Sequence, residues 1–413
     1  MLLYYAKRPI LLFIVINILI FTLIYAYRQP YEINILLIGA GVLVINLIIY
    51  SSFQRWEFGD KYLFIIASML VMFSIAMLCR IKYETGLKQI IWYGIGLFCF
   101  VISFLVYYHG KNWDKLFWWY FIGIVVLFIV TQAIGHTVGG SNRWIIIGGY
   151  SIQPSEIIKI LFTFFLSSHL ARKKIKTYGK KQIQEKYIIM LCVYVVCGFF
   201  ILQRDWGSMV LFFSTYLFTV FVHGEQVFIL LTNFSAMCLA CWYAANNLSH
   251  IQIRISNWLA PFGDITNKSF QTAQSLFAIS SGGFFGSGIG LGHPEYIPEV
   301  HSDFIFSAIC EELGIFGGCA VILLFFILVY RGFKIALASR GIDKWIALII
   351  STMFALQTFI IIGGVINLIP LTGITLPFIS SGGSSLVTTF ISLGILQSIS
   401  YKNERVADIV DNA

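Results

Sequence analysis

Charged residues are scarce in this sequence. Of its 413 residues only 11% are charged, with 19 acidic side chains against 28 basic ones, whereas 58% are hydrophobic. A soluble globular protein is typically about 25% charged and about 45–50% apolar. The shortage of charge therefore excludes an ordinary soluble domain. Short segments that alternate between polar and apolar residues are also missing, which excludes a transmembrane β-barrel.

Cysteine is equally sparse, and its placement excludes a disulfide framework. All eight cysteines lie in apolar segments, and the one C-x-x-C pair, Cys238 and Cys241, is part of an apolar run. Buried cysteines in such segments behave as small hydrophobic side chains. We therefore interpret them as buried thiols and predict neither disulfides nor a cysteine metal site.

Long apolar runs are what the sequence has in abundance. A run of about 18–25 residues can cross a hydrocarbon core of about 30 Å, and backbone groups in lipid must pair within their own segment, so the spans should be helices. We predict an all-α polytopic membrane protein with about 12 transmembrane helices. The predicted spans are 9–27, 33–53, 62–82, 88–108, 116–135, 156–171, 187–203, 206–222, 225–245, 304–330, 345–367 and 382–400.

The basic residues predict the orientation of these spans. Seven Lys and Arg side chains lie between positions 172 and 186, in a loop that should be cytoplasmic. Counting spans from that loop places both termini in the cytoplasm, although it leaves Arg80 on the outer side. Because the net charge of +9 resides in short loops, we read it as a topology signal and predict no nucleic-acid partner.

Two extracytoplasmic loops result from this count, at about 136–155 and about 246–303. The longer one contains many aromatic residues and a run of glycines from Gly282 to Gly290, which we interpret mainly as tight turns. With the Pro- and Gly-rich stretch at 366–383, these loops predict a polar outer cavity set into an apolar bundle. Such a cavity suits a lipid with a polar head.

Ionisable residues gather at the end of the longer loop. Glu295, Glu299, His301 and Asp303 directly precede an apolar helix. Asp303 alone could be a helix cap, but ionisable groups clustered at a membrane boundary are costly and tend to be functional. The cluster therefore favours a site.

Further charges lie within or between the spans. Lys159 is in a helix and needs a partner, and an ion pair between Lys159 and Asp205 would satisfy both residues. Glu311 and Glu312 lie about two turns into their helix, so at least one must face the bundle interior. We expect this acidic pair to order helix packing below the site.

Four motifs in order resemble those of one family. "GGSNRWIIIGGYSIQPSEIIKI", "QSLFAISSGGFFGSGIG", "IPEVHSDFIFSAICEELG" and "LPFISSGGSSL" are similar to motifs of the FtsW/RodA/SpoVE family, also called SEDS proteins. The resemblance covers roughly residues 62–400. It implies a core of about ten spans at 61–400, an extra N-terminal helix pair at 1–60 and a cytoplasmic tail at 401–413.

The resemblance implies a peptidoglycan glycosyltransferase in the bacterial cytoplasmic membrane. Such an enzyme transfers the growing glycan strand from its undecaprenyl diphosphate carrier to the GlcNAc 4-hydroxyl of lipid II. The family works beside a class B penicillin-binding protein, a transpeptidase. Division, elongation and sporulation share these motifs, so the resemblance does not separate the three roles.

Site residues are also implied by the resemblance. Asp303 falls on the catalytic aspartate and Glu295 on a functionally sensitive acid, while Lys159 and Asp205 fall on the ion pair. The remaining candidates for binding the substrate and its diphosphate are Arg143, Lys159, Arg204, Arg254, His301, Gln274 and Ser275. A divalent cation, Mg or Mn, could assist through Glu295 or Asp303, although the sequence offers no ordered ligand set.

The sequence departs from the family pattern at two motif positions. Arg204 stands where the family usually has proline, and Ser381 stands where it usually has tyrosine. Three other interpretations stay open: a lipid II flippase, a catalytically inactive scaffold that recruits a transpeptidase, and an O-antigen-ligase-like enzyme. Clustering of acids and glycines on one face favours chemistry there over transport.

Overall fold

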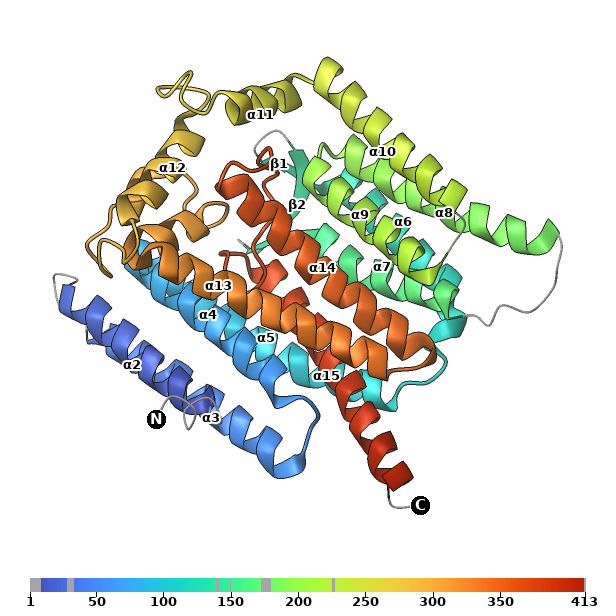
Figure 1. The fold of residues 1–413 in the computed structure, drawn as a ribbon, viewed down its shortest axis with the longest axis horizontal. Coiled ribbons are helices and arrows are strands. Elements are labelled where there is room, and N and C mark those ends of the chain that lie inside the picture. The colour runs from blue at the N-terminus through green and yellow to red at the C-terminus, as the bar shows by residue number, and fades with distance from the viewer. Residues whose placement is uncertain are drawn as a thin grey trace.

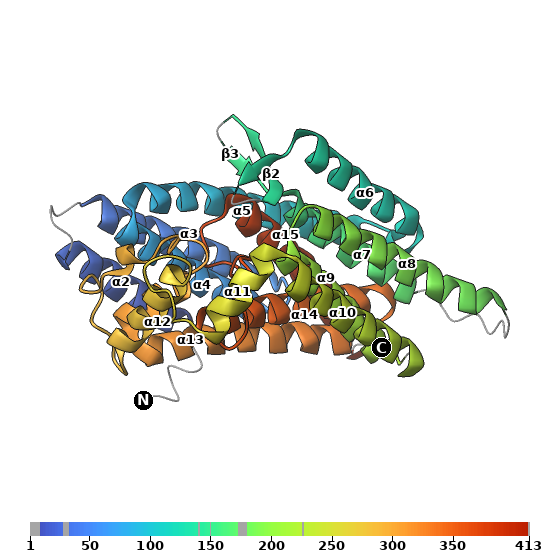
Figure 2. The ribbon, with the colours of Figure 1, turned by 90° about the horizontal axis from the view of Figure 1, so that it is seen from above.

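The computed structural model describes residues 9–27, 33–138, 141–148, 150–171, 180–224 and 227–411, which form a helical bundle (Figures 1 and 2). All twelve predicted spans fall on α-helices. The long helices are α2 (Pro9–Tyr27), α3 (Asn34–Trp56), α4 (Lys61–Ile81), α5 (Tyr83–His109), α6 (Phe117–Ile134), α7 (Pro154–Leu170), α8 (Lys180–Leu202), α9 (Trp206–His223), α10 (Val227–Asn247), α13 (Ile305–Ala338), α14 (Gly341–Val365) and α15 (Gly383–Asp411).

Ten helices of the described chain are long and apolar enough to cross a membrane. The two predicted spans outside this number are α7, which has 17 residues, and α8, whose apolar part is Tyr187–Leu202. The chain is therefore a multi-pass membrane protein. The predicted orientation rests on the basic residues between positions 172 and 186, and those at 172–179 lie outside the described residues.

Helices α4 and α14 form the centre of the bundle. In their apolar windows 94% and 83% of the residues are buried, against 28% for α2 and α3. The N-terminal pair α2 and α3 lies on one flank beside α4 (Figure 1). A hydrogen bond of 2.6 Å from the Tyr93 hydroxyl to Asn46 Oδ1 ties α3 to α5 within the apolar interior.

One element departs from the all-α prediction. The segment between α6 and α7 forms an antiparallel sheet of β1 (His136–Val138), β2 (Ser141–Ile147) and β3 (Tyr150–Ile152), with β2 in the middle. Strands β2 and β3 project beyond the helices beside α6 (Figure 2). The β-branched run Ile145–Ile147 favours a strand, but it is too short to stand out beside the apolar spans.

The long loop predicted at 246–303 is largely structured. It contains α11 (Ser249–Leu259), α12 (Phe270–Gly282) and a 3-10 turn, η2 (Pro294–Tyr296). Its glycine-rich part packs directly on α13, because a Cβ at Gly286 would lie 2.2 Å from the Glu312 carbonyl oxygen. Helix α13 is itself broken at Gly314, where φ is 69° and the backbone of Phe284 and Gly286 approaches closely.

Candidate functional site

Two of the sequence motifs meet in the short segment that ends at Asp303. The Ser381 amide donates to the His301 carbonyl at 2.9 Å, and the Ser380 hydroxyl donates to the Ser302 carbonyl at 2.5 Å. The Ser74 hydroxyl on α4 in turn donates to the Ile379 carbonyl. The segment before Asp303 is therefore fixed by the loop between α14 and α15. The contact through Ser381 uses its backbone, which does not depend on the side chain at that position.

Asp303 is not the cap of the following helix. Phe304 occupies the cap position of α13, and no side-chain hydrogen bond caps that helix. A left-handed backbone at Glu299 (φ 55°) instead begins a turn in which the amides of Ser302 and Asp303 both donate to the Glu299 carbonyl. The turn leaves the Asp303 carboxylate available for chemistry.

The Asp303 carboxylate lies beside Arg254. A Cβ built at Gly373 would lie 3.5 Å from Asp303 Oδ2 and 3.6 Å from Arg254 Nη2, so both groups lie against this glycine. Burial raises the pKa of Asp303 above its usual value, Glu299 adds to this, and Arg143 and Arg254 act in the opposite direction. Two effects thus oppose each other at this carboxylate: desolvation favours its protonated form, and the nearby cations favour its ionised form.

Arg254 also lines a cavity of about 390 Å³, which we name the arginine cavity. Its ionisable lining residues, apart from Cys241, are Arg143, Arg204, Arg254, His250 and Asp205. The remaining wall is mainly apolar and comes from α9, α10, α11 and α14 with the segment that follows it. Three guanidinium groups thus face one carboxylate in a largely apolar setting, which suits an anion attached to an apolar chain.

The three arginines lie in different segments of the chain. Arg143 lies on β2, and Arg254 lies on α11, where its Nη1 donates to the Leu371 and Thr372 carbonyls at 3.0 and 2.8 Å. Arg204 lies between α8 and α9 with φ at 58°. Proline is fixed near φ −65°, so the junction in this chain has a backbone that proline cannot adopt.

The predicted ion pair between Lys159 and Asp205 is wrong. Lys159 Nζ lies 2.7 Å from Glu156 Oε2, one turn away on α7, and donates to Gln357 Oε1 at 3.2 Å. Asp205 caps α9 by accepting from the Ser208 amide and hydroxyl, and it pairs loosely with Arg143 at 3.7 Å. Lys159 therefore pairs within its own helix, whereas Asp205 contacts an arginine that is distant in the sequence.

Lys159 belongs to a buried network rather than to the arginine cavity. It lines a separate cavity of about 20 Å³. The same network includes Thr388, which donates to Glu156 at 2.9 Å, and Gln357, which donates to the Thr375 carbonyl at 2.7 Å. Since Thr375 lies two residues beyond Gly373, the network holds the loop that approaches Asp303.

Arg80, which disagreed with the predicted orientation, has a structural partner. Its Nε lies 3.0 Å from Glu312 Oε1, and its Nη2 donates to the Gly290 and Gly292 carbonyls. Glu312 also accepts from the Gly290 amide, and Glu311 accepts from the His293 amide. At least one of these glutamates was predicted to face the interior; both are buried, and they fix the glycine-rich loop to α13.

The other predicted site residues do not line the arginine cavity. Glu295 is exposed and lies 3.2 Å from His293 Nδ1, while His301 Nε2 lies 3.6 Å from Glu299. Ser275 is fully buried and bonded to the Ser307 hydroxyl at 2.6 Å. Gln274, its half-buried neighbour, lies outside the arginine cavity as Ser275 does. The geometry therefore assigns Ser275 to packing between α12 and α13.

The described residues contain no preformed cluster of metal ligands. Among them, no group of three or more His, Cys, Asp or Glu side chains could hold a metal ion. Glu295 pairs with His293, and Asp303 has arginines as its cationic neighbours. Mg²⁺ is commonly held by one or two carboxylates together with substrate phosphates, so a cation held by Glu295 or Asp303 stays a prediction.

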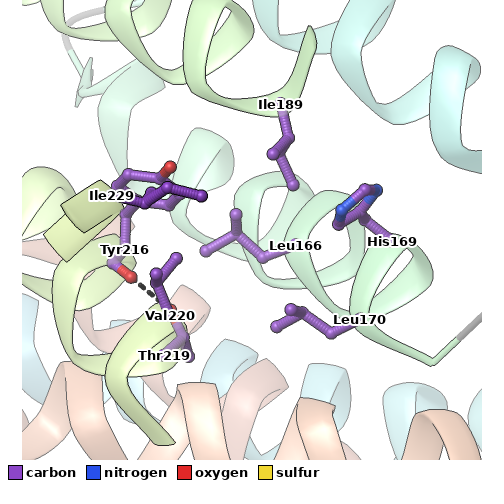
Figure 3. Close-up of a pocket in the computed structure, with 8 residues that line it drawn as sticks. All are labelled: Leu166, His169, Leu170, Ile189, Tyr216, Thr219, Val220 and Ile229. Atoms are coloured by element: carbon purple, nitrogen blue, oxygen red, sulfur yellow. Dashed lines mark hydrogen bonds between the residues drawn. The ribbon is translucent and has the colours of Figure 1, made fainter. Parts of the chain in front are cut away.

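Two other cavities differ from the arginine cavity in chemistry. A cavity of about 20 Å³ near the C-terminal ends of α7 and α9 is lined mainly by apolar side chains, with His169 at one side (Figure 3). The larger one, of about 790 Å³, lies where α4 begins and α13 and α15 approach their ends. Neither combines an excess of cations with a nearby carboxylate, so neither is our candidate site.

Most of the chain matches a known protein family in sequence. Residues 62–405 match the family FTSW_RODA_SPOVE, described as "Cell cycle protein". The chain is 34% identical to peptidoglycan glycosyltransferase RodA of Mycobacterium tuberculosis, over 78% of this chain and 72% of that protein. It is also 34% identical to stage V sporulation protein E of Bacillus subtilis, over 76% of this chain and 86% of that protein.

Solved structures show the same fold. The crystal structure of the rod shape determining protein RodA of Thermus thermophilus aligns with a TM-score of 0.60 and 24% identity, over 84% of this chain and 98% of that chain. A chain from "Structural coordination of polymerization and crosslinking by a peptidoglycan synthase complex" aligns with a TM-score of 0.69 and 23% identity, over 84% and 98%.

Proposed function

The chain belongs to the FtsW/RodA/SpoVE family, and from this premise we propose that Asp303 and the arginine cavity form the active site of a peptidoglycan glycosyltransferase. The observation that carries the proposal is their adjacency. Asp303 and Arg254 flank Gly373, and Arg254 lines the cavity. A carboxylate beside a cationic, largely apolar cavity provides a base next to a binding site for a lipid-linked diphosphate.

The acceptor is lipid II, and the donor is a glycan strand on undecaprenyl diphosphate or, in the first turnover, a second lipid II. The acceptor 4-hydroxyl oxygen forms a bond to the donor sugar C1, and its proton passes to the Asp303 carboxylate. The bond from C1 to the diphosphate breaks, and its electron pair stays on the phosphate oxygen. The donor is an α-glycoside and the polymer is β-linked, so one inverting displacement suffices.

The protein contributes a base and positive charge to this displacement. Asp303 must be ionised to accept the proton, and Arg143 and Arg254 favour that ionised form. Arg143, Arg204 and Arg254 stabilise the charge that develops on the leaving diphosphate. The apolar walls from α9, α10 and α14 accommodate the start of the polyprenyl chain.

The proposal extends to sidedness and partners. It places the arginine cavity at the outer face of the cytoplasmic membrane, with both chain termini in the cytoplasm. It also assigns a class B penicillin-binding protein as the partner that cross-links the product. The neighbouring solved structure described as a peptidoglycan synthase complex supports this assignment by analogy of fold.

The test uses the purified full-length chain supplied with lipid II. Wild type should form glycan polymer, and Asp303→Asn should lower the rate by about 10²–10⁴-fold, the contribution typical of a general base. Asp264→Asn is the matched control, because Asp264 closes a turn with Thr266 and Asn267 in the same long loop. Polymer formation by Asp303→Asn at the wild-type rate would overturn the assignment. Lipid II translocation without polymer formation by wild type would instead favour a flippase.

A further inference from the structure

His250 is an ionisable residue of the arginine cavity that the mechanism above does not use. It is the second residue of α11, and its side chain lines the cavity together with Arg204 and Arg254. Its Nε2 atom is buried and has no hydrogen-bond partner among the described residues. A buried polar atom left without a partner loses its hydration without compensation. A ligand group placed in the cavity would supply that partner.

The charges around His250 specify the ligand. Arg254 faces it from α11, Arg204 from the junction of α8 and α9, and Arg143 from β2, against Asp205 at the start of α9; α10 contributes Cys241 to the lining. Burial, Arg254 and Arg204 lower the pKa of His250 below its usual 6.5. Without an anion the imidazole is therefore neutral at neutral pH. A bound anion favours the charged form and reverses this balance.

We propose that His250 is a diphosphate-binding residue whose Nε2–H donates to a phosphate oxygen, and that the imidazole takes up a proton when the diphosphate binds. This inference rests on the proposed function, because the donor's diphosphate is the anion assigned to the cavity. Cleavage of the bond to C1 leaves a further negative charge on the diphosphate. The imidazolium and the three arginines face that charge together, so the protonated site matches the leaving group better than the neutral one does.

Proton uptake on binding provides the direct test. Undecaprenyl diphosphate is titrated calorimetrically into the full-length Asp303→Asn protein in detergent, in two buffers of different protonation enthalpy. The Asn at 303 removes a neighbouring titratable carboxylate, and the difference between proteins with and without His250 isolates the proton that the imidazole takes up. We expect close to one proton per bound ligand with His250 present. The Asp303→Asn/His250→Gln protein should take up almost none, since the amide can hydrogen-bond but cannot titrate. Equal uptake by both proteins would overturn the proposal.

Steady-state kinetics give a second readout. His250→Phe should raise KM for lipid II about tenfold, the loss expected for one hydrogen bond to a charged group, and His250→Gln should recover part of it. Ser249→Ala, an exposed neighbour on α11, is the matched control. A purely structural role would lower the melting temperature of His250→Phe and leave KM unchanged, which would contradict the proposal.

The two failures are distinguishable. If wild type binds undecaprenyl diphosphate with proton uptake but makes no polymer, the proposed function fails and the role of His250 in anion binding stands. If wild type polymerises lipid II and the histidine variants keep both their KM and their proton uptake, only the inference about His250 fails.

Discussion

Charges are balanced differently at the two ends of the bundle. In the arginine cavity three arginines face one aspartate. The cavity at the opposite end is larger, about 790 Å³, and its charged lining residues are equal in number: Glu57, Asp60 and Glu404 against Lys61, Arg331 and Lys334. There Arg331 bonds to Asp60 at 2.5 Å and lies over the Tyr62 ring at 3.9 Å.

The difference shows that cavity size alone does not identify a binding site. Balanced charges satisfy one another and order the helices that carry them, whereas an excess of one sign in an apolar wall requires an opposite charge from elsewhere. Arg80 with Glu312, and Lys159 with Glu156, follow the balanced pattern although both pairs lie near the site. Substitutions of paired charges should therefore affect stability, whereas substitutions of the arginines in the arginine cavity should affect substrate binding.

Breaking a buried pair should give the largest effect on stability. Arg80→Met leaves Glu312 buried and unpaired and removes two hydrogen bonds to the glycine-rich loop. We expect the free energy of unfolding to fall by about 3–5 kcal/mol, measured by thermal denaturation in detergent. Adding Glu312→Leu removes the stranded charge and should recover much of the loss. If the Arg80→Met protein is as stable as wild type, the pair of Arg80 and Glu312 does not hold the glycine-rich loop.

Removing an unpaired cation should instead affect substrate binding. Arg143 has only a loose contact of 3.7 Å with Asp205, and its Nε has no hydrogen-bond partner among the described residues. Arg143→Gln should raise KM for lipid II by about 10–100-fold, corresponding to about 1.5–3 kcal/mol for a bond to a charged group. The control is Arg331→Gln, which removes a paired cation at the opposite end. Equal effects of Arg143→Gln and Arg331→Gln on KM would contradict the distinction between paired and unpaired charge.

The pH profile should reveal how the cations act on Asp303. Because burial raises the pKa of Asp303, the ionised base is lost, and kcat/KM falls about tenfold per pH unit, as pH drops below that raised pKa. Arg143 opposes the rise, so Arg143→Gln should move the acidic limb of the profile to higher pH. The measurement is kcat/KM against pH for both proteins. An unshifted limb would mean that Arg143 does not influence the base.

The smallest expected effect concerns the backbone of Arg204. Its φ of 58° is costly for any residue with a Cβ and free for glycine. Arg204→Gly and Arg204→Ala remove the same guanidinium group, so both should weaken lipid II binding alike. The glycine variant should nevertheless be more stable, by roughly 0.4–1 kcal/mol in unfolding free energy. Equal stability of the two would indicate that the left-handed backbone carries no strain.

The helical spans could be predicted because hydropathy is a local property. A run such as Lys61–Ile81 is apolar enough to span a membrane whatever surrounds it. Asp303 was identified as a candidate because it lies in a motif shared with a known family, and its catalytic role stays a prediction. The small sheet around Arg143 was missed, because strands of 3 and 7 residues leave little periodic signal beside long apolar helices.

Partners of ionisable residues were the hardest feature to predict. Lys159 was paired with Asp205 in our prediction, although Glu156, one turn away on the same helix, is its partner. That i, i+3 spacing could have suggested the correct pair. No comparable signal joins Arg80 to Glu312, or brings His250 to Arg204, because these residues are far apart in the chain.

The sequence by itself determined that this protein is a multi-pass membrane protein of the FtsW/RodA/SpoVE family with its acids and glycines gathered in a few loops. Hydropathy and motif order are local properties of the sequence and do not depend on which segments come into contact. Only the tertiary structure decided which charges are paired and which remain available. That outcome depends on how α7, α11, α13 and the loop at Gly373 come together, since a charge in an apolar bundle is defined by the nearest opposite charge.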